Sequence, residues 1–193
     1  MQLKDMIGRV RRALVDVPPD RYGDYDIIEL LNNGQKELTG YSHKKETVEV
    51  KIEPEQENIP FPEDLLKLVN AYIGERGIEL KDLNREMKRK EYGEPRSYYV
   101  RQGKLYLWPI PRVEDTVIIE YIPHPEKLTE DDDEPSIEGA AEYMVAYALR
   151  QIYMELNSPL FELWQQEKMR LLHLFVDNED QHYQGSFTVN LRW

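Results

Sequence analysis

The chain has 193 residues, no cysteine and a net charge of −12. The length suits one domain, or one domain with a sizeable insertion, and the absence of cysteine excludes disulfides, thiolate zinc sites and a cysteine nucleophile. No apolar run approaches the roughly 20 residues that cross a bilayer, and Asp5 interrupts the stretch where a signal peptide needs an apolar core. We therefore expect neither export nor a membrane partner.

Two amphipathic helices are expected at the N-terminus. Apolar residues recur at helical spacing over residues 2–17, and Pro18 and Pro19 end that pattern. A second helix begins at Asp24, a plausible N-cap, and continues to Gly40. The short turn between them predicts a helical hairpin.

The middle of the chain changes to the period of a β-strand. Residues 47–53 alternate apolar and charged side chains, and residues 64–73 fit a short buried strand or a helical turn, of which we favour the strand. Residues 80–92 carry apolar positions at helical steps with basic residues between them, which predicts a helix.

A hairpin is the clearest feature of the β region. Residues 98–101 and 104–108 flank Gln102 and Gly103, a dipeptide suited to a tight turn. The β-branched run at residues 116–122 supplies a third strand, which completes a minimal sheet. The aromatic residues expected to pack across its face are Tyr98, Tyr106, Trp108 and Tyr121.

Two more helices are expected towards the C-terminus. Ser136 is placed to cap a helix over residues 137–156, which has a broad apolar stripe. Ser158 and Pro159 then predict a break and a restart, so that the next helix lies antiparallel to the first. Its apolar face is expected to include Leu160, Leu163, Trp164, Leu171, Leu174 and Phe175.

The last residues predict an extended strand, because apolar and polar side chains alternate to the chain end. Such a strand can complete its own sheet or add to the sheet edge of another chain. The polar lead-in favours another chain. The apolar positions are Phe187, Val189, Leu191 and Trp193.

The predicted fold class is α+β. An N-terminal helix pair and a long antiparallel C-terminal helix hairpin form a helical bundle, into which a small antiparallel β-sheet is inserted. A single domain is expected over residues 1–180, with a helical core at 1–42 and 136–180 and a β-rich insertion at 46–126. Residues 181–193 are expected to form an extended docking tail.

The acidic run from Glu130 to Glu134 is the strongest candidate for chemistry, because hard cations bind clustered carboxylates. It lacks the calcium-loop pattern, and the favoured interpretation is that these acids precede a helix whose positive end attracts negative charge. No paired-histidine motif and no phosphate-binding loop is present. We therefore expect no catalytic residue, no metal site and no cofactor.

A basic patch lies at Arg85, Lys88, Arg89 and Lys90. These side chains can contact phosphates of passing DNA, pair with a neighbouring subunit or face water. The net negative charge argues against wrapping nucleic acid but suits a channel through which a duplex passes without adhering.

Four stretches together resemble the head–tail connector, or adaptor, proteins of tailed bacteriophages: residues 95–99, residues 103–109, residues 119–121 with Pro125, and residues 128–137. The resemblance implies a virion structural protein at the portal vertex of the capsid, present in the host cytoplasm during assembly. It implies a ring, commonly dodecameric, that docks under the portal protein, contacts a tail or nozzle protein and extends the channel for double-stranded DNA without sequence specificity.

The resemblance also implies a role for the C-terminal segment, which in such proteins often reaches onto the portal. In this chain the matching residues are Phe187, Val189, Leu191 and Trp193. If the segment orders only on assembly, the free subunit is monomeric.

Two other functions stay open. One is a metal-dependent nuclease or phosphoesterase that uses the acidic cluster at residues 130–134. The other is a regulatory module that binds another protein through the same tail, with a fixed low stoichiometry and no ring.

Overall fold

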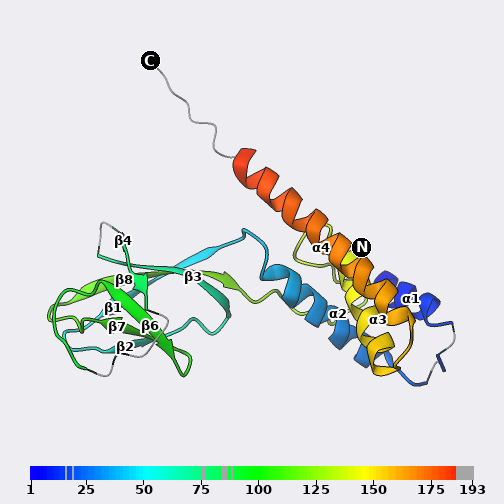
Figure 1. Cartoon of the computed structure of the whole chain (residues 1–193), viewed down its shortest axis with the longest axis horizontal. Helices are drawn as coiled ribbons and strands as arrows, with labels where there is room; N and C mark the ends of the chain where they lie inside the picture. The colour runs from blue at the N-terminus through cyan, green and yellow to red at the C-terminus, as the bar shows by residue number, and fades with distance from the viewer. Residues whose placement is uncertain (16, 19, 75–76, 84–86, 88, 186–193) are drawn as a thin grey trace, which may run out of the picture. The chain divides into compact units, whose positions relative to one another are not determined.

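A computed structural model describes residues 1–185, except 16, 19, 75–76, 84–86 and 88 (Figure 1). The chain divides into two compact units, which are considered separately. The helical unit comprises Met1–His43 and Pro125–Trp193, and the β unit comprises Lys44–His124. The described residues contain helices and two small sheets, which confirms the α+β class.

The helical unit contains α1 (Leu3–Ala13), α2 (Asp24–Thr39), α3 (Ala140–Glu155) and α4 (Leu160–Gly185). α1 ends four residues before the predicted end at residue 17. Asp24 is the first residue of α2 and not its N-cap, because Gly23 occupies the cap position and its amide donates to the Asp26 carboxylate at 2.8 Å.

The start of α3 differs from the prediction that Ser136 caps it. The helix begins after Gly139, whose φ of 77° lies in the left-handed region that glycine adopts without steric cost. The amide of Ser136 instead donates to Gln35 Oε1 at 3.2 Å, so this residue belongs to the preceding loop.

The predicted break between the last two helices is confirmed. Asn157 adopts a φ of 50°, and Ser158 Oγ accepts a hydrogen bond from the Leu160 amide at 3.3 Å. α4 then continues to Gly185, so residues 181–185 are helical and not part of an extended tail.

α3 is the centre of the helical unit, since it contacts α1, α2 and α4 (Figure 1). A Cβ atom at Gly34 of α2 would lie 3.2 Å from the Met144 Cα, so the missing side chain lets α2 and α3 approach closely. Three residues assigned to the apolar face of α4, Leu160, Leu163 and Leu174, are exposed. The fully buried side chains of this core include Leu3, Met6, Val10, Ile27, Leu31, Ala148, Leu149 and Ile152.

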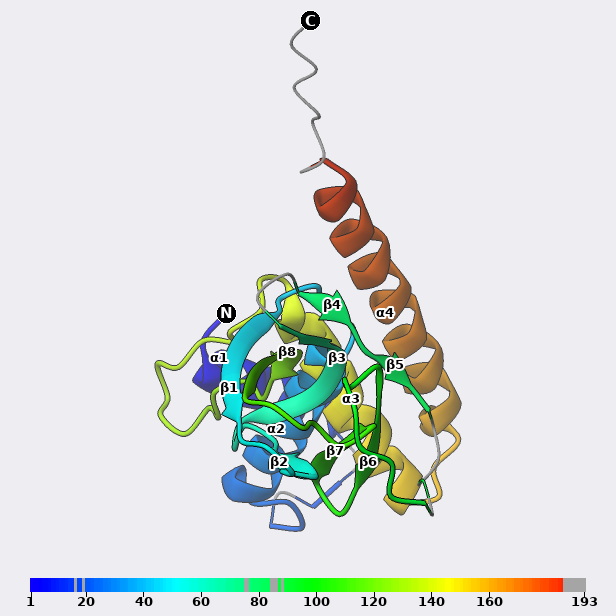
Figure 2. The same ribbon diagram turned by 90° about the vertical axis from the view of Figure 1, so that its left-hand side faces the viewer.

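The β unit contains two four-stranded sheets and not the single sheet predicted (Figure 2). One has the order β1 (Glu46–Ile52), β8 (Asp115–Pro123), β3 (Leu65–Ile73), β4 (Ile78–Glu79). The other has the order β2 (Asn58–Pro60), β7 (Lys104–Trp108), β6 (Ser97–Arg101), β5 (Lys81–Asp82). The strand preference at residues 64–73 is therefore confirmed, while the predicted third strand of the hairpin sheet, β8, lies in the other sheet.

The hairpin itself is confirmed. β6 and β7 pair antiparallel, and Gln102 and Gly103 have φ values of 50° and 69°. Two consecutive positive φ angles are the pattern of a tight turn whose twist matches the flanking strands.

The helix predicted over residues 80–92 is wrong for the residues that the structure describes there. Leu80 is buried in the β core, and the amides of Lys81 and Leu83 donate to the carbonyls of Arg96 and Tyr98 at 3.0 and 2.9 Å. Because this backbone pairs with β6, it cannot form the hydrogen bonds of a helix.

The two sheets share one apolar core, and strands of both sheets contribute buried side chains to it. Tyr98 and Tyr121 are buried in it, whereas Tyr106 and Trp108 are only half-buried, so the predicted aromatic face is divided. The fully buried members are Ile52, Ile59, Ala71, Leu105, Val117 and Ile119.

Within the described residues, no helix combines the length and the apolar character that a membrane crossing requires.

Candidate interaction surfaces

The acidic loop, residues 130–134, lies at the N-terminus of α1 and not at that of α3 as the sequence suggested. The amides of Leu3 and Lys4 donate to the carbonyls of Asp133 and Asp131 at 2.8 and 3.1 Å. These are amides that a helix leaves without internal partners, and the positive end of the helix favours the acids around them.

Several acids in this loop are engaged within the helical unit. Lys4 Nζ lies 2.7 Å from Asp132, and the terminal amine of Met1 lies 3.8 Å from Glu134. Asp133 Oδ2 accepts hydrogen bonds from the amides of Thr129 and Glu130 at 2.7 and 2.9 Å. The backbone hydrogen bonds from Glu130 and Thr129 hold the pKa of Asp133 below its ordinary value.

Two of the exposed acids in this loop have no ion-pair partner in the described part of the chain. Glu130 and Asp131 are exposed, and neither forms an ion pair within the part of the chain that the structure describes. The loop therefore presents these two carboxylates from a backbone that the amides of Leu3 and Lys4 hold in place.

Two amide side chains of α2 fix the segment that leads into and out of this loop. Asn32 donates to the Leu128 carbonyl and accepts from the Leu128 amide, both at 2.9 Å. Gln35 is fully buried and donates to the Glu126 carbonyl at 2.7 Å while it accepts from Ser136. These hydrogen bonds were not predicted from the sequence. The signal that could have revealed them is the presence of a glutamine, Gln35, on the otherwise apolar face of α2.

The described residues contain no group of three or more histidine, aspartate or glutamate side chains arranged to hold one metal ion. The carboxylates of the acidic loop instead bind backbone amides and amines, or face outward.

Of the predicted basic patch, Arg89 and Lys90 are described, and Arg85 and Lys88 lie outside the described residues. Lys90 pairs with Glu57, and their hydrogen bond raises the pKa of Lys90. Arg89 is exposed and makes no ion pair within the described ranges.

A cavity of about 250 Å³, here called the basic pocket, brings Arg89 and Lys90 together with the β6–β7 hairpin. The Tyr99 and Tyr106 rings stack with centroids 5.0 Å apart and an angle of 13° between their planes. The full lining is Glu57, Met87, Arg89, Lys90, Tyr99, Arg101, Tyr106, Leu107, Trp108 and Ile110. The two basic residues were predicted from the sequence, but the position of Tyr99 and Tyr106 beside them was not, because the hairpin register decides which rings face the patch.

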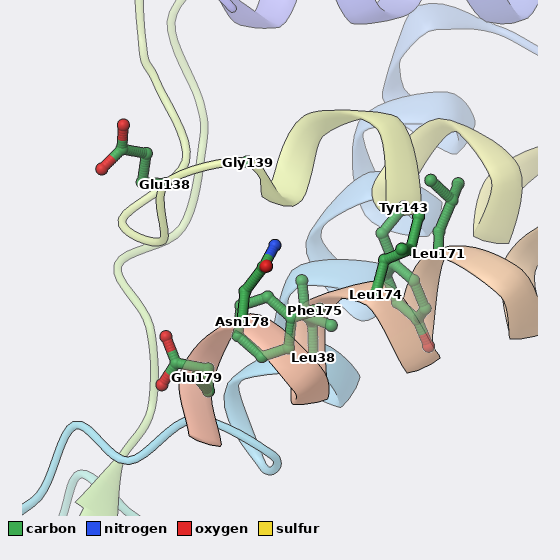
Figure 3. Close-up of a pocket in the computed structure, with 9 residues that line it drawn as sticks. All are labelled: Leu38, Glu138, Gly139, Tyr143, Leu171, Leu174, Phe175, Asn178 and Glu179. Atoms are coloured by element: carbon green, nitrogen blue, oxygen red, sulfur yellow. The ribbon is translucent and has the colours of Figure 1, made fainter. Parts of the chain in front are cut away.

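A second cavity, of about 490 Å³, lies in the helical unit. Figure 3 shows that its lining comes from α2, α3, α4 and the turn at Glu138 and Gly139. Its floor is apolar, and Glu179 on its rim accepts a hydrogen bond from the His43 amide at 2.9 Å. The lining residues are Leu38, Glu138, Gly139, Tyr143, Leu171, Leu174, Phe175, Asn178 and Glu179.

A polar cluster ties α4 to α2 and α3. Glu37 accepts hydrogen bonds from Tyr143 Oη and Lys168 Nζ, each at 2.7 Å. Partial burial acts to raise the pKa of Glu37, but the bonds from Lys168 and Tyr143 outweigh it and the pKa is lowered. Burial, with the bond to Glu37, raises the pKa of Tyr143.

Charge is distributed unevenly between the two units. The helical unit has 11 basic and 21 acidic residues, a net charge of −10, whereas the β unit has 14 basic and 16 acidic residues, a net charge of −2.

The predicted docking residues Phe187, Val189, Leu191 and Trp193 lie outside the described residues.

Comparison with known proteins gives one family. The SU10 adaptor protein family matches residues 1–190, nearly the whole chain. No curated protein matches this chain. A match of this extent confirms the resemblance seen in the sequence: the chain belongs to the SU10 adaptor protein family, a family of phage head–tail adaptors, and is a phage structural protein.

Proposed function

We propose that this protein is the head–tail adaptor that assembles as a ring beneath the portal, extends the DNA channel and connects the capsid to a tail or nozzle protein. The observation that carries the proposal is the family match over residues 1–190, which includes both units and most of the C-terminal segment.

The C-terminal segment is proposed to dock on the portal. Residues 186–193 follow the end of α4 and carry four apolar side chains in strict alternation. Such a segment can add to a sheet edge, where main-chain hydrogen bonds supply affinity and pockets for alternate side chains supply specificity. If the segment docks only on a portal ring, the free subunit stays monomeric and rings form only when the portal is bound.

The contact with DNA is proposed to be weak and independent of sequence. A ring of subunits that each carry a net charge of −12 repels phosphates over about a Debye length, roughly 8 Å at physiological salt. A duplex would then slide through the channel without stable binding.

The nuclease alternative has less support. Asp132, Asp133 and Glu134 are engaged by Lys4, backbone amides and the terminal amine. A metal would have to displace these partners before the loop could supply a complete oxygen ligand set.

The test is co-sedimentation with the purified portal ring, followed by mass determination of the complex. The full chain should form a stoichiometric ring on the portal, and a chain truncated after Gly185 should not, because the truncation removes the docking residues and leaves α4 complete. A complex of low, fixed stoichiometry without a ring would favour the regulatory alternative.

A matched pair of variants sharpens the test. Leu191→Ser with Trp193→Ser removes two apolar positions of the alternation and should abolish docking. Thr188→Ala with Asn190→Ala changes only the polar positions and should leave docking intact. Equal docking by both pairs would refute the assigned roles of the apolar residues.

A further inference from the structure

We infer that the basic pocket of one copy receives the acidic loop of a second copy, with Glu130 and Asp131 as the carboxylates that enter it. The inference rests on the proposed ring, and it assigns the contact that joins neighbouring subunits within that ring.

The chemistry of the basic pocket fits a carboxylate. Arg89, Lys90 and Arg101 all line it and can only donate hydrogen bonds, and arginine binds carboxylates with paired, directional bonds. Glu57, an acid in the lining, pairs with Lys90. Arg89 forms no ion pair within the described residues.

The shape and the aromatic wall favour a protein partner over duplex DNA. A concave space of about 250 Å³ takes one or two side chains, whereas a duplex backbone needs a row of exposed cations along its length. The stacked pair of Tyr99 and Tyr106 adds rings with polar tips, which are enriched at protein interfaces.

The acidic loop has the properties of a preorganised ligand. Its backbone is held by the amides of Leu3 and Lys4, and its flanks are held by Asn32 and Gln35. Glu130 and Asp131 are exposed and form no ion pair within the described residues, and the fixed backbone that carries them limits the conformational entropy lost on binding.

The local charges of the two surfaces are opposite in sign. The acidic loop presents Glu130 and Asp131, and Arg89, Lys90 and Arg101 line the basic pocket. A contact between two different surfaces of identical subunits is heterologous, and heterologous contacts generate rings when the rotation closes.

Charge reversal tests this contact on the assembled portal complex. A pocket variant, Arg89→Glu with Arg101→Glu, and a loop variant, Glu130→Lys with Asp131→Lys, should each lower the ring yield by on the order of tenfold or more, because like charges then meet at every contact. All four side chains are exposed, so thermal melting should match that of the unmodified chain.

Restoration separates a specific contact from a general charge effect. A mixture of the two variants should restore rings in which the variants alternate, since each reversed loop then meets a reversed pocket. The chain that carries all four substitutions should also form rings by itself.

The outcomes distinguish this inference from the proposed function. Unmodified protein that forms no ring on the portal would refute both. Unmodified rings together with normal rings from each variant would refute the inference alone. Loss of rings in the pocket variant, without rescue by the loop variant and with loss of binding to a short duplex DNA, would identify a phosphate site instead.

Discussion

The helical unit and the β unit present opposite kinds of surface by different means. In the helical unit, buried polar side chains such as Gln35 reach from a helix to a loop and fix the exposed acids. In the β unit, exposed cations line a pocket whose walls follow from strand register. Changes inside the helical unit should therefore alter stability and surface together, whereas changes at the basic pocket should alter binding alone.

The largest expected effect comes from a substitution in the core of the helical unit, the unit that carries the acidic loop. Leu149 is fully buried in α3 at the centre of the helical unit. Leu149→Ala should lower the free energy of unfolding by about 2–5 kcal/mol, because it leaves a cavity among packed helices. Chemical denaturation followed by the helical circular dichroism signal measures this, and Leu163→Ala on the exposed face of α4 is the control, expected to change it by less than about 0.5 kcal/mol.

The next effect tests whether buried polar contacts fix the loop. Gln35→Ala should lower the free energy of unfolding by about 1–3 kcal/mol, because it leaves the Glu126 carbonyl and the Ser136 amide without their partner. It should also speed amide hydrogen exchange in residues 126–136. Asn33→Ala, at an exposed position of the same helix, should do neither. Unchanged exchange in the loop would contradict the assigned role of Gln35.

A smaller effect concerns the polar cluster on α4. Lys168→Met leaves the half-buried Glu37 carboxylate with only Tyr143 as donor, and should destabilise the unit by roughly 1–2 kcal/mol at neutral pH. The folded-state pKa of Glu37 is lowered, so its contribution is present above the ordinary pKa of 4.5 and is lost as the pH falls through the folded value. The variant and the unmodified chain should therefore converge in acid, and a constant difference would exclude this ion pair as the cause.

The smallest effect is local to the acidic loop. Asp133→Asn should weaken the turn that closes on the amides of Thr129 and Glu130. Because the pKa of Asp133 is lowered in the folded chain, protection of these amides should be full above the ordinary aspartate pKa and decline as the pH falls through the folded value. Amide exchange measured by NMR against pH would show whether the variant has lost this dependence.

Features that depend on neighbouring residues in the sequence could be predicted. The β6–β7 hairpin follows from Gln102 and Gly103, and the α3–α4 break follows from Ser158 and Pro159, because turn geometry is decided by a few adjacent residues. The family itself was predicted from four short stretches and is confirmed.

Features that depend on distant partners could not be predicted. Residues 80–92 have a helical pattern of apolar positions, yet pairing with β6 and burial of Leu80 override it. The acidic loop precedes α3 in the sequence but binds the amides of α1, which no local pattern reveals. The basic pocket likewise required the register that brings Tyr99 and Tyr106 together beside Arg89.

The proposed adaptor ring is best tested by measuring the mass of the complex that this chain forms with the purified portal ring. We expect a closed ring of this chain on the portal, present with the full chain and absent after truncation at Gly185. A chain that stays unbound, or a complex of one or two copies per portal ring, would contradict the proposed adaptor ring.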